Sequence, residues 1–174
     1  MTSTRLSPEI WITAGYDALC DGGPTALAAE AMARRLTTTK GSFYWHFKDV
    51  PAYHAALVHH WQAAALADVL ACLEETGAPD KRLRNFGKSI LASKTETALR
   101  AWANSDPSVA KSMAYVDEKR LAYIQHLLDT FGLRNPAFSQ AILAALIGLP
   151  QIKIHPADSH AGFEALVDTI LALT

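Results

Sequence analysis

Alanine and leucine dominate this sequence, and the alternation of apolar and polar residues that marks β-strands is almost absent. Proline and glycine divide the chain at intervals, at positions suited to the starts and ends of helices. Pro8, for example, suits the first turn of a helix that Gly22 and Gly23 would end. The pattern predicts an all-α protein of about nine helices.

The expected helices follow this punctuation. They are predicted at about 8–21, 27–35, 38–45, 51–75, two within 80–103, 107–131, 136–149 and from 159 towards the end. The last of them carries apolar residues at spacings of 3, 1, 3 and 1, which is a continuous helical face.

The net charge of −1 gives the chain no general attraction to nucleic acid, so DNA binding would have to depend on local charge. Between Ala31 and Lys48 there are four Arg or Lys residues and no acid, a surplus of +4 within 18 residues. Hydroxyl, phenol and imidazole groups accompany these cations, as a phosphate-facing surface requires. By composition alone, the segment also fits an ordinary solvated face.

The order of residues in this segment is more specific. From Thr39 to Phe47 the chain reads TKGSFYWHF, and Met32-Ala33 precedes it at the expected end of a helix. This resembles the TetR family of transcriptional regulators, whose third helix reads Thr/Ser-Lys-Gly-Ser-Phe/Leu-Tyr-x-His-Phe, and the resemblance covers about residues 8–57. It implies a three-helix helix-turn-helix DNA-binding domain at 1–50. A C-terminal helical domain at 51–174 would bind an effector and form a dimer.

The resemblance also implies roles within the third helix. Residues at its N-terminal end would approach base edges in the major groove, and residues further along would hold phosphates. Trp45 would pack against the domain or the DNA sugar edge, while Phe43 and Phe47 would pack in the core. The predicted DNA-binding residues are Thr38, Thr39, Lys40, Gly41, Ser42, Tyr44, Trp45, His46 and Lys48.

Three departures from the family pattern predict fewer phosphate anchors than usual. Thr37-Thr38 stands where the turn usually has Gly-Val. The segment 28–30, Ala-Ala-Glu, replaces the usual hydroxyl and base at the start of the second helix. Val50 replaces a basic residue. Each lost phosphate contact should lower the salt dependence of DNA binding by about 0.9 in the logarithmic slope.

The C-terminal two-thirds resembles the family only in architecture and in short stretches. Aromatic and polar residues on its helices predict an effector cavity, although such residues more often form core. These are Trp61, Phe86, Trp102, Met113, Tyr115, Tyr123 and His126. The last two helices carry wide apolar faces that predict a four-helix dimer interface. These faces comprise Ile142, Leu143, Leu146, Phe163, Leu166, Val167 and Ile170. The alternative is that they close the core of the single chain.

Other chemistry is not indicated. His54, His59 and His60 lack the spacing that puts two imidazoles on one helix face, so no metal and no cofactor are predicted. No catalytic motif nominates a nucleophile, and the chain is expected not to be an enzyme. Cys20 and Cys72 are expected to be buried or half-buried thiols in a reducing cytoplasm.

No membrane segment is expected either. The first eight residues lack the apolar core of a signal peptide, and no apolar run reaches the length of about 20 residues that crosses a bilayer. Residues 137–150 are the longest candidate.

The sequence therefore predicts a cytoplasmic, ligand-responsive repressor that binds a palindromic double-stranded DNA operator as a homodimer. The first alternative is a dimeric helical sensor or carrier of a small molecule that has weak or lost specific DNA binding. The second is an activator, or a nucleoid-type binder with little sequence preference.

Overall fold

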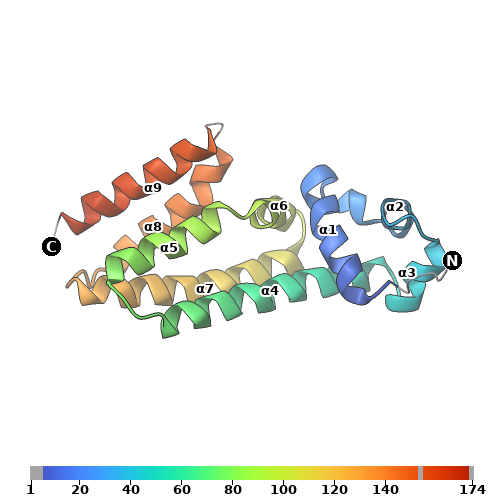
Figure 1. Cartoon of the computed structure of the whole chain (residues 1–174), viewed down its shortest axis with the longest axis horizontal. Helices are drawn as coiled ribbons and strands as arrows, with labels where there is room; N and C mark the ends of the chain where they lie inside the picture. The colour runs from blue at the N-terminus through green and yellow to red at the C-terminus, as the bar shows by residue number, and fades with distance from the viewer. Residues whose placement is uncertain (1–5, 153–154, 173–174) are drawn as a thin grey trace.

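The computed structural model describes residues 6–152 and 155–172, and within them it consists of helices without any strand. Nine α-helices and two short 3-10 helices occur in this part of the chain (Figure 1). In order they are α1 (Pro8–Gly22), η1 (Pro24–Leu27), α2 (Ala29–Arg35), α3 (Lys40–His46), α4 (Val50–Glu74), α5 (Pro79–Leu91), α6 (Lys94–Ala103), α7 (Pro107–Thr130), α8 (Pro136–Gly148), η2 (Leu149–Gln151) and α9 (Pro156–Leu171). The predicted all-α fold is confirmed.

Side-chain caps and first-turn prolines explain where the long helices begin. The carboxylate of Asp49 accepts a hydrogen bond of 2.7 Å from the backbone N–H of Ala52 at the start of α4. Asp106 does the same for the first turn of α7, which begins with Pro107. These caps satisfy backbone donors that have no partner within the helix. The last helix begins at Pro156, three residues before the predicted start at Ser159.

The helices form an elongated molecule (Figure 1). The short helices α1, α2 and α3 lie at one end, and α4 and α7 run side by side in the same direction along the long axis. The helices α5, α8 and α9 pack at the other end, with α6 between the two groups.

Two hydrophobic cores hold these groups together. The first joins α1–α3 to the first half of α4, and Leu99 of α6 and Val109 of α7 also belong to it. The second is formed by the second half of α4, α5, the end of α7, α8 and α9. Both α4 and α7 therefore contribute to the two cores.

The close approach of α1 to α4 depends on Gly15. A Cβ atom at this position would lie 2.3 Å from the hydroxyl oxygen of Tyr53 and 2.5 Å from a methyl group of Leu57. The same Tyr53 hydroxyl donates a hydrogen bond of 2.7 Å to the backbone oxygen of Trp11. Glycine thus allows the two helices to meet closely enough for this bond to form.

A buried ion network joins α6 to α7. Arg120 donates two hydrogen bonds to Glu96, at 2.5 and 2.8 Å, and both side chains are about 95% buried. Arg100 bridges Glu96 and Asp117, at 2.7 Å from each. Burial alone would raise the pKa of Glu96, but the hydrogen bonds and charges of Arg120 and Arg100 outweigh it and hold the pKa below its usual range.

Helix α4 is longer and more apolar than expected from the sequence. By length and composition it could cross a membrane: an 18-residue window within it has a mean hydropathy of 1.3. The expectation that no stretch reaches this length, with residues 137–150 as the longest candidate, was therefore wrong. Core helices of soluble proteins have the same composition, and α4 contributes Tyr53, Leu57 and Trp61 to the first core. Only 28% of the apolar window is buried, however.

Candidate nucleic-acid interface

The predicted recognition segment forms the seven-residue helix α3, and Thr39 caps it by accepting a hydrogen bond of 3.3 Å from the N–H of Ser42. Phe43 is fully buried and meets the rings of Trp11 and Tyr53 edge-on, at 5.5 and 5.2 Å between ring centroids. Phe47 lies 4.8 Å from the Tyr53 ring. Both phenylalanines are core residues, as predicted, and they fix α3 to α1 and α4.

Trp11 and Tyr53 position the recognition segment, yet the sequence analysis did not single them out. Burial raises the pKa of Tyr53, so its hydroxyl stays a protonated donor to Trp11. A usable signal was present, because Tyr53 follows Pro51 within the first turn of a predicted helix. An aromatic residue there can face the helix that precedes it.

The other side of α3 is open to solvent. Lys40, Gly41, Tyr44, Trp45 and Lys48 are exposed. Trp45 is the most open of the large apolar side chains described, at 70%, and Tyr44 is 47% exposed. Most of the Trp45 side chain is therefore open to solvent.

Three of the remaining four predicted DNA contacts are less accessible, and the fourth, Thr39, is exposed. Thr38, Ser42 and His46 are half-buried, and the His46 ring lies 6.4 Å from that of Trp11. The hydroxyl of Thr39 already serves as the helix cap. The open surface of the segment is thus made chiefly by two lysines and two aromatic side chains.

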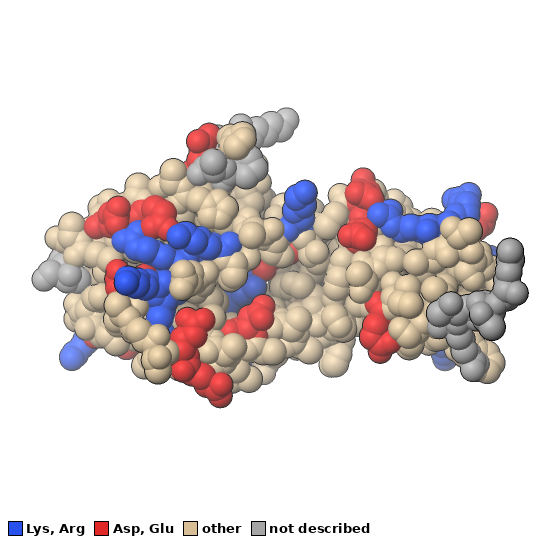
Figure 2. Space-filling model, in the orientation of Figure 1, with Lys and Arg blue, Asp and Glu red and all other residues tan. Residues whose placement is uncertain are grey.

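Part of the predicted local charge surplus is neutralised. Arg35 forms an ion pair of 2.7 Å with Asp21, and Arg34 lies 3.9 Å from Glu30. Figure 2 likewise shows basic and acidic side chains next to one another over both ends of the molecule. Within the described residues, Lys40 and Lys48 form no ion pair, so their charges are available to an anionic partner.

The turn between α2 and α3 is made without glycine. Thr37 occupies the left-handed region, with φ 50°, and it is the one residue other than glycine with positive φ in the described chain. This conformation is unfavourable for a β-branched residue, by about 1–2 kcal/mol. The backbone therefore keeps the turn that the usual glycine would form, at the expense of strain.

Replacing Thr37 with glycine should therefore stabilise the protein by about 1 kcal/mol, since relief of the strain exceeds the entropy lost on ordering glycine. Thermal unfolding should shift upward by about 2–4 °C for a chain of this size. The matched control is Thr25→Gly, also at an exposed threonine but without positive φ. An unchanged or lower midpoint of thermal unfolding for Thr37→Gly would show that Thr37 is not strained.

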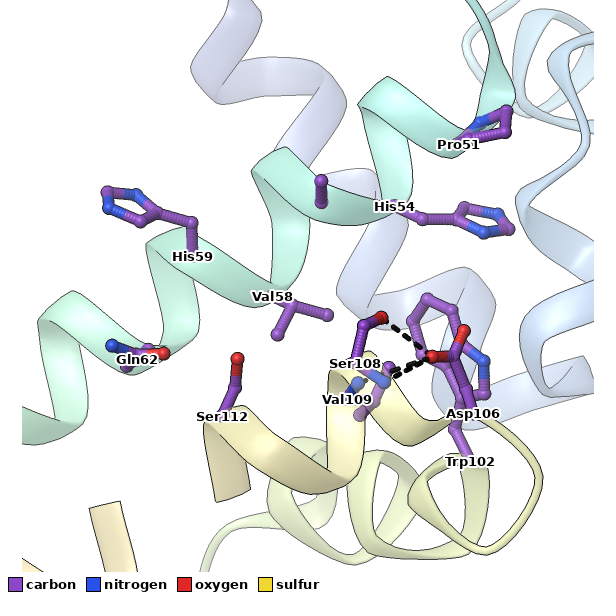
Figure 3. A pocket seen from close by; sticks show the side chains of 11 residues that line it. Pro51, His54, Val58, His59, Gln62, Trp102, Asp106, Ser108, Val109 and Ser112 are labelled. Atoms are coloured by element: carbon purple, nitrogen blue, oxygen red, sulfur yellow. Dashed lines mark hydrogen bonds between the residues drawn. The ribbon is translucent and has the colours of Figure 1, made fainter. Parts of the chain in front are cut away.

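A contact between α4 and α6, which we call the joint, lies near the α1–α3 end of the molecule (Figure 3). His54 on α4 meets Trp102 of α6 edge-on, at 4.9 Å between ring centroids. A hollow of about 360 Å³ lies beside them, between α4 and the start of α7. Burial lowers the pKa of His54, and the nearby charge of Asp106 opposes this shift only in part. His54 and Trp102 are 48 positions apart and give no local signal, so their contact could not be predicted from the sequence.

Possible metal ligands are scattered over the part of the chain that the structure describes. Figure 3 shows His54 and His59 pointing in opposite directions from α4. No group of three His, Cys, Asp or Glu side chains that could hold a metal occurs among the described residues. Both cysteines are free thiols; Cys72 is half-buried, but Cys20 is exposed, contrary to the expectation for it.

The predicted effector residues do not line one cavity. Trp61 and Phe86 border a small cavity of about 140 Å³ between α4, α5 and α7. Trp102 lies at the joint, and Met113 borders another hollow beside α6. All four are buried in the two cores, so each has a packing role.

The other three predicted effector residues lie together. Tyr115, Tyr123 and His126 project from α7 towards a groove of about 470 Å³ that α4 completes. The hollow beside His54 and Trp102 is smaller, at about 360 Å³. Sequence reasoning therefore located part of the groove while missing the leucines of α4 that form its other wall.

The predicted dimer residues lie mainly inside the chain. Six of the seven are buried in the second core, and Leu166 is half-buried. The apolar faces of α8 and α9 thus close the chain's own core, which is the alternative that the sequence left open. The outer side of α8 is different in character: Ala137, Gln140, Ala141 and Ala144 are exposed, and the whole helix lacks charged residues.

The sequence matches no protein-family model and no curated protein, but its fold is similar to several solved structures. A TetR-family transcriptional regulator from Streptomyces coelicolor superposes with a TM-score of 0.75 at 15% identity, over 93% of this chain and 86% of that one. A transcriptional regulator of the TerR/AcrR family from Aquifex aeolicus gives 0.73 at 14% identity, over 94% and 98%. The fatty acid degradation regulator of Bacillus halodurans gives 0.68 at 14% identity, over 92% and 96%.

These likenesses extend over nearly the whole chain. They show the same all-helical fold. The chain has the fold of the TetR-family transcriptional regulators.

Proposed function

We propose that this protein is a transcriptional repressor of the TetR type that binds a palindromic operator as a homodimer in the cytoplasm. The observation that carries the proposal is the open surface of α3 and of Lys48 just after it. Lys40 and Lys48 have no ion-pair partner among the described residues, and Tyr44 and Trp45 are exposed. Lysine and phenol groups bind phosphates, and Lys40 at the start of α3 would approach base edges.

Two copies are needed to read a palindrome, and the outer face of α8 supports an interface between them. It presents small, uncharged side chains, which allow helices from two subunits to pack closely. Since its buried face is occupied by the second core, this outer face is the one available to a second copy.

Placing a charge on that face should separate the subunits. Ala144→Glu, at an exposed position of α8, would bury an unpaired carboxylate in the dimer and should shift the protein to monomer in sedimentation experiments. The contact can be mapped further with Ala161→Glu and Ala165→Glu on α9. Ala63→Glu on α4 is the control outside the proposed interface. A dimer that survives Ala144→Glu but not Ala63→Glu would place the interface elsewhere.

An effector would act by favouring one arrangement of the two recognition helices. Helix α4 begins four residues after the end of α3 and continues for 25 residues through both cores. A ligand that changes the packing of α4 would therefore move α3 and alter the spacing of the half-sites.

The proposal predicts a discrete, salt-dependent complex with the DNA upstream of the protein's own gene. A mobility-shift titration with this duplex should give one complex that competes poorly with unrelated DNA. A complex of equal strength with every duplex would favour a nucleoid-type binder. An activator would bind the same DNA but raise transcription from it.

The second candidate is a dimeric sensor or carrier that has lost specific DNA binding. Ala28 favours it, because it occupies the N-cap of α2 without providing a side-chain hydroxyl. Glu30 and Val50 also replace possible phosphate contacts, although Arg34 partly neutralises Glu30. This candidate predicts ligand binding with no discrete DNA complex at any operator tested.

A further inference from the structure

An apolar groove follows the second half of α4, beside the middle of α7. Leu70, Leu73 and Tyr115 line it and are 63%, 47% and 44% exposed. They account for three of the seven large apolar side chains that are exposed within the described residues. Apolar side chains gathered in this way mark a binding surface more often than isolated ones do.

Neither the fold nor the proposed dimer covers this groove. Only 28% of the apolar window of α4 is fully buried in the chain. Figure 1 places α4 and α9 at opposite edges of the molecule. A second copy that packs on the α8 and α9 side would therefore leave the groove open.

A buried hydrogen-bond donor lies at the inner side of the groove. Tyr123, which lines it, is 1% exposed, and its hydroxyl has no hydrogen-bond partner among the described residues. A buried donor without an acceptor is unfavourable, so this position favours an acceptor oxygen.

The charged groups that line the groove are basic. Lys119 and His126 lie two turns apart on α7, and no acidic side chain lines the groove within the described residues. Lys119 packs over the Tyr115 ring at 5.1 Å and forms an exposed pair with Glu118. An exposed pair of this kind is weak, so Lys119 remains available to an anion.

We propose that the groove binds a small amphipathic carboxylate. Its alkyl chain packs on Leu70 and Leu73 of α4, and its carboxylate faces Lys119 and Tyr123 of α7. The groove follows α4 from Leu66 to Leu73, a rise of about 10 Å, which suits a medium-length chain such as that of octanoate.

Only the effect of octanoate on DNA binding depends on the proposed function. A ligand between α4 and α7 would act on the helix that leads from α3, and octanoate should then weaken the operator complex. Binding to the groove itself does not depend on whether the protein binds DNA.

Isothermal titration calorimetry of the full chain tests the site with octanoate, octyltrimethylammonium and acetate. We expect octanoate to bind once per chain, and the cation of the same chain length to bind at least about tenfold more weakly. Acetate, which lacks the alkyl chain, should give no measurable binding.

Variants locate the bound molecule. Leu70→Asp alters an exposed position and Lys119→Glu a half-buried one, and each should weaken octanoate binding by about tenfold or more. Tyr123→Phe keeps the ring but removes the donor, so it should weaken octanoate and leave octyltrimethylammonium unchanged. Ile152→Asp is the matched control, because Ile152 is 57% exposed and lies outside the groove.

The inference fails if octanoate gives no binding, if both amphiphiles bind equally, or if Leu70→Asp binds octanoate like the wild type. It also fails if the protein assembles beyond a dimer and Leu70→Asp abolishes that assembly, since the groove would then join copies of the chain. Octanoate binding without any change in operator affinity would support the site and contradict the effector role in the proposed function.

Discussion

Glu96→Leu should lower the free energy of unfolding by about 3–5 kcal/mol, because it removes the main partner of a buried arginine. Arg120 is 5% exposed, and its remaining partner is Asp117 at 3.8 Å. The measurement is chemical denaturation at neutral pH. Since the loss comes from an uncompensated charge, it should far exceed that of an ordinary surface substitution.

The double variant Glu96→Leu/Arg120→Met provides the control. It replaces both charges with apolar side chains, so most of the lost stability should return, while Arg100 keeps its bond to Asp117. If the double variant were as unstable as the sum of the single variants, the network would contribute through packing and not through charge.

The network also predicts an acid limit to stability. The folded-state pKa of Glu96 is lowered, so the stabilisation is present above the pKa of the unfolded chain and disappears as the pH falls through the folded pKa. Wild-type protein should therefore lose stability on acidification more steeply than the double variant does. The same denaturation series at stepwise lower pH measures this difference.

Lys40→Ala and Tyr44→Ala should each weaken operator binding by about tenfold to a hundredfold, through losses of about 1–3 kcal/mol. Tyr44→Ala should weaken all duplexes alike, because a phosphate contact fixes register without reading sequence. Lys40→Ala should in addition change base preference, because this residue opens α3. Fluorescence anisotropy with the operator and with single-base variants separates the two effects.

Both residues are exposed, so the loss should occur with little change in thermal stability. Lys81→Ala removes a lysine of α5 far along the chain and serves as the charge-matched control. Unchanged operator affinity in both Lys40→Ala and Tyr44→Ala would contradict the proposed docking.

The sequence was most informative where local rules decide the structure. The prolines and aspartates at 49, 51, 106 and 107 mark the starts of α4 and α7 because a cap acts within one turn. Phe43 and Phe47, four residues apart, had to share one face of a short helix, and the structure buries both.

Long-range packing was harder to predict. The apolar faces of α8 and α9 fit both a dimer interface and a monomer core, since hydrophobic periodicity identifies a buried face without identifying what covers it. Likewise, Trp61 and Tyr115 seemed equally suited to a cavity, although one is buried and the other exposed. The contact of His54 with Trp102 depends on how α4 meets α6, which no local pattern encodes.

The first core has a practical consequence for protein engineering. Because Tyr53 and Leu57 of α4 pack with Leu99 of α6 and Val109 of α7, a fragment that ends at residue 50 would lose much of what encloses Trp11 and Phe43. Such a fragment should be unable to fold alone. Chimeras that exchange the C-terminal helices should therefore retain α6 and the beginning of α7 from the parent that supplies α1–α3.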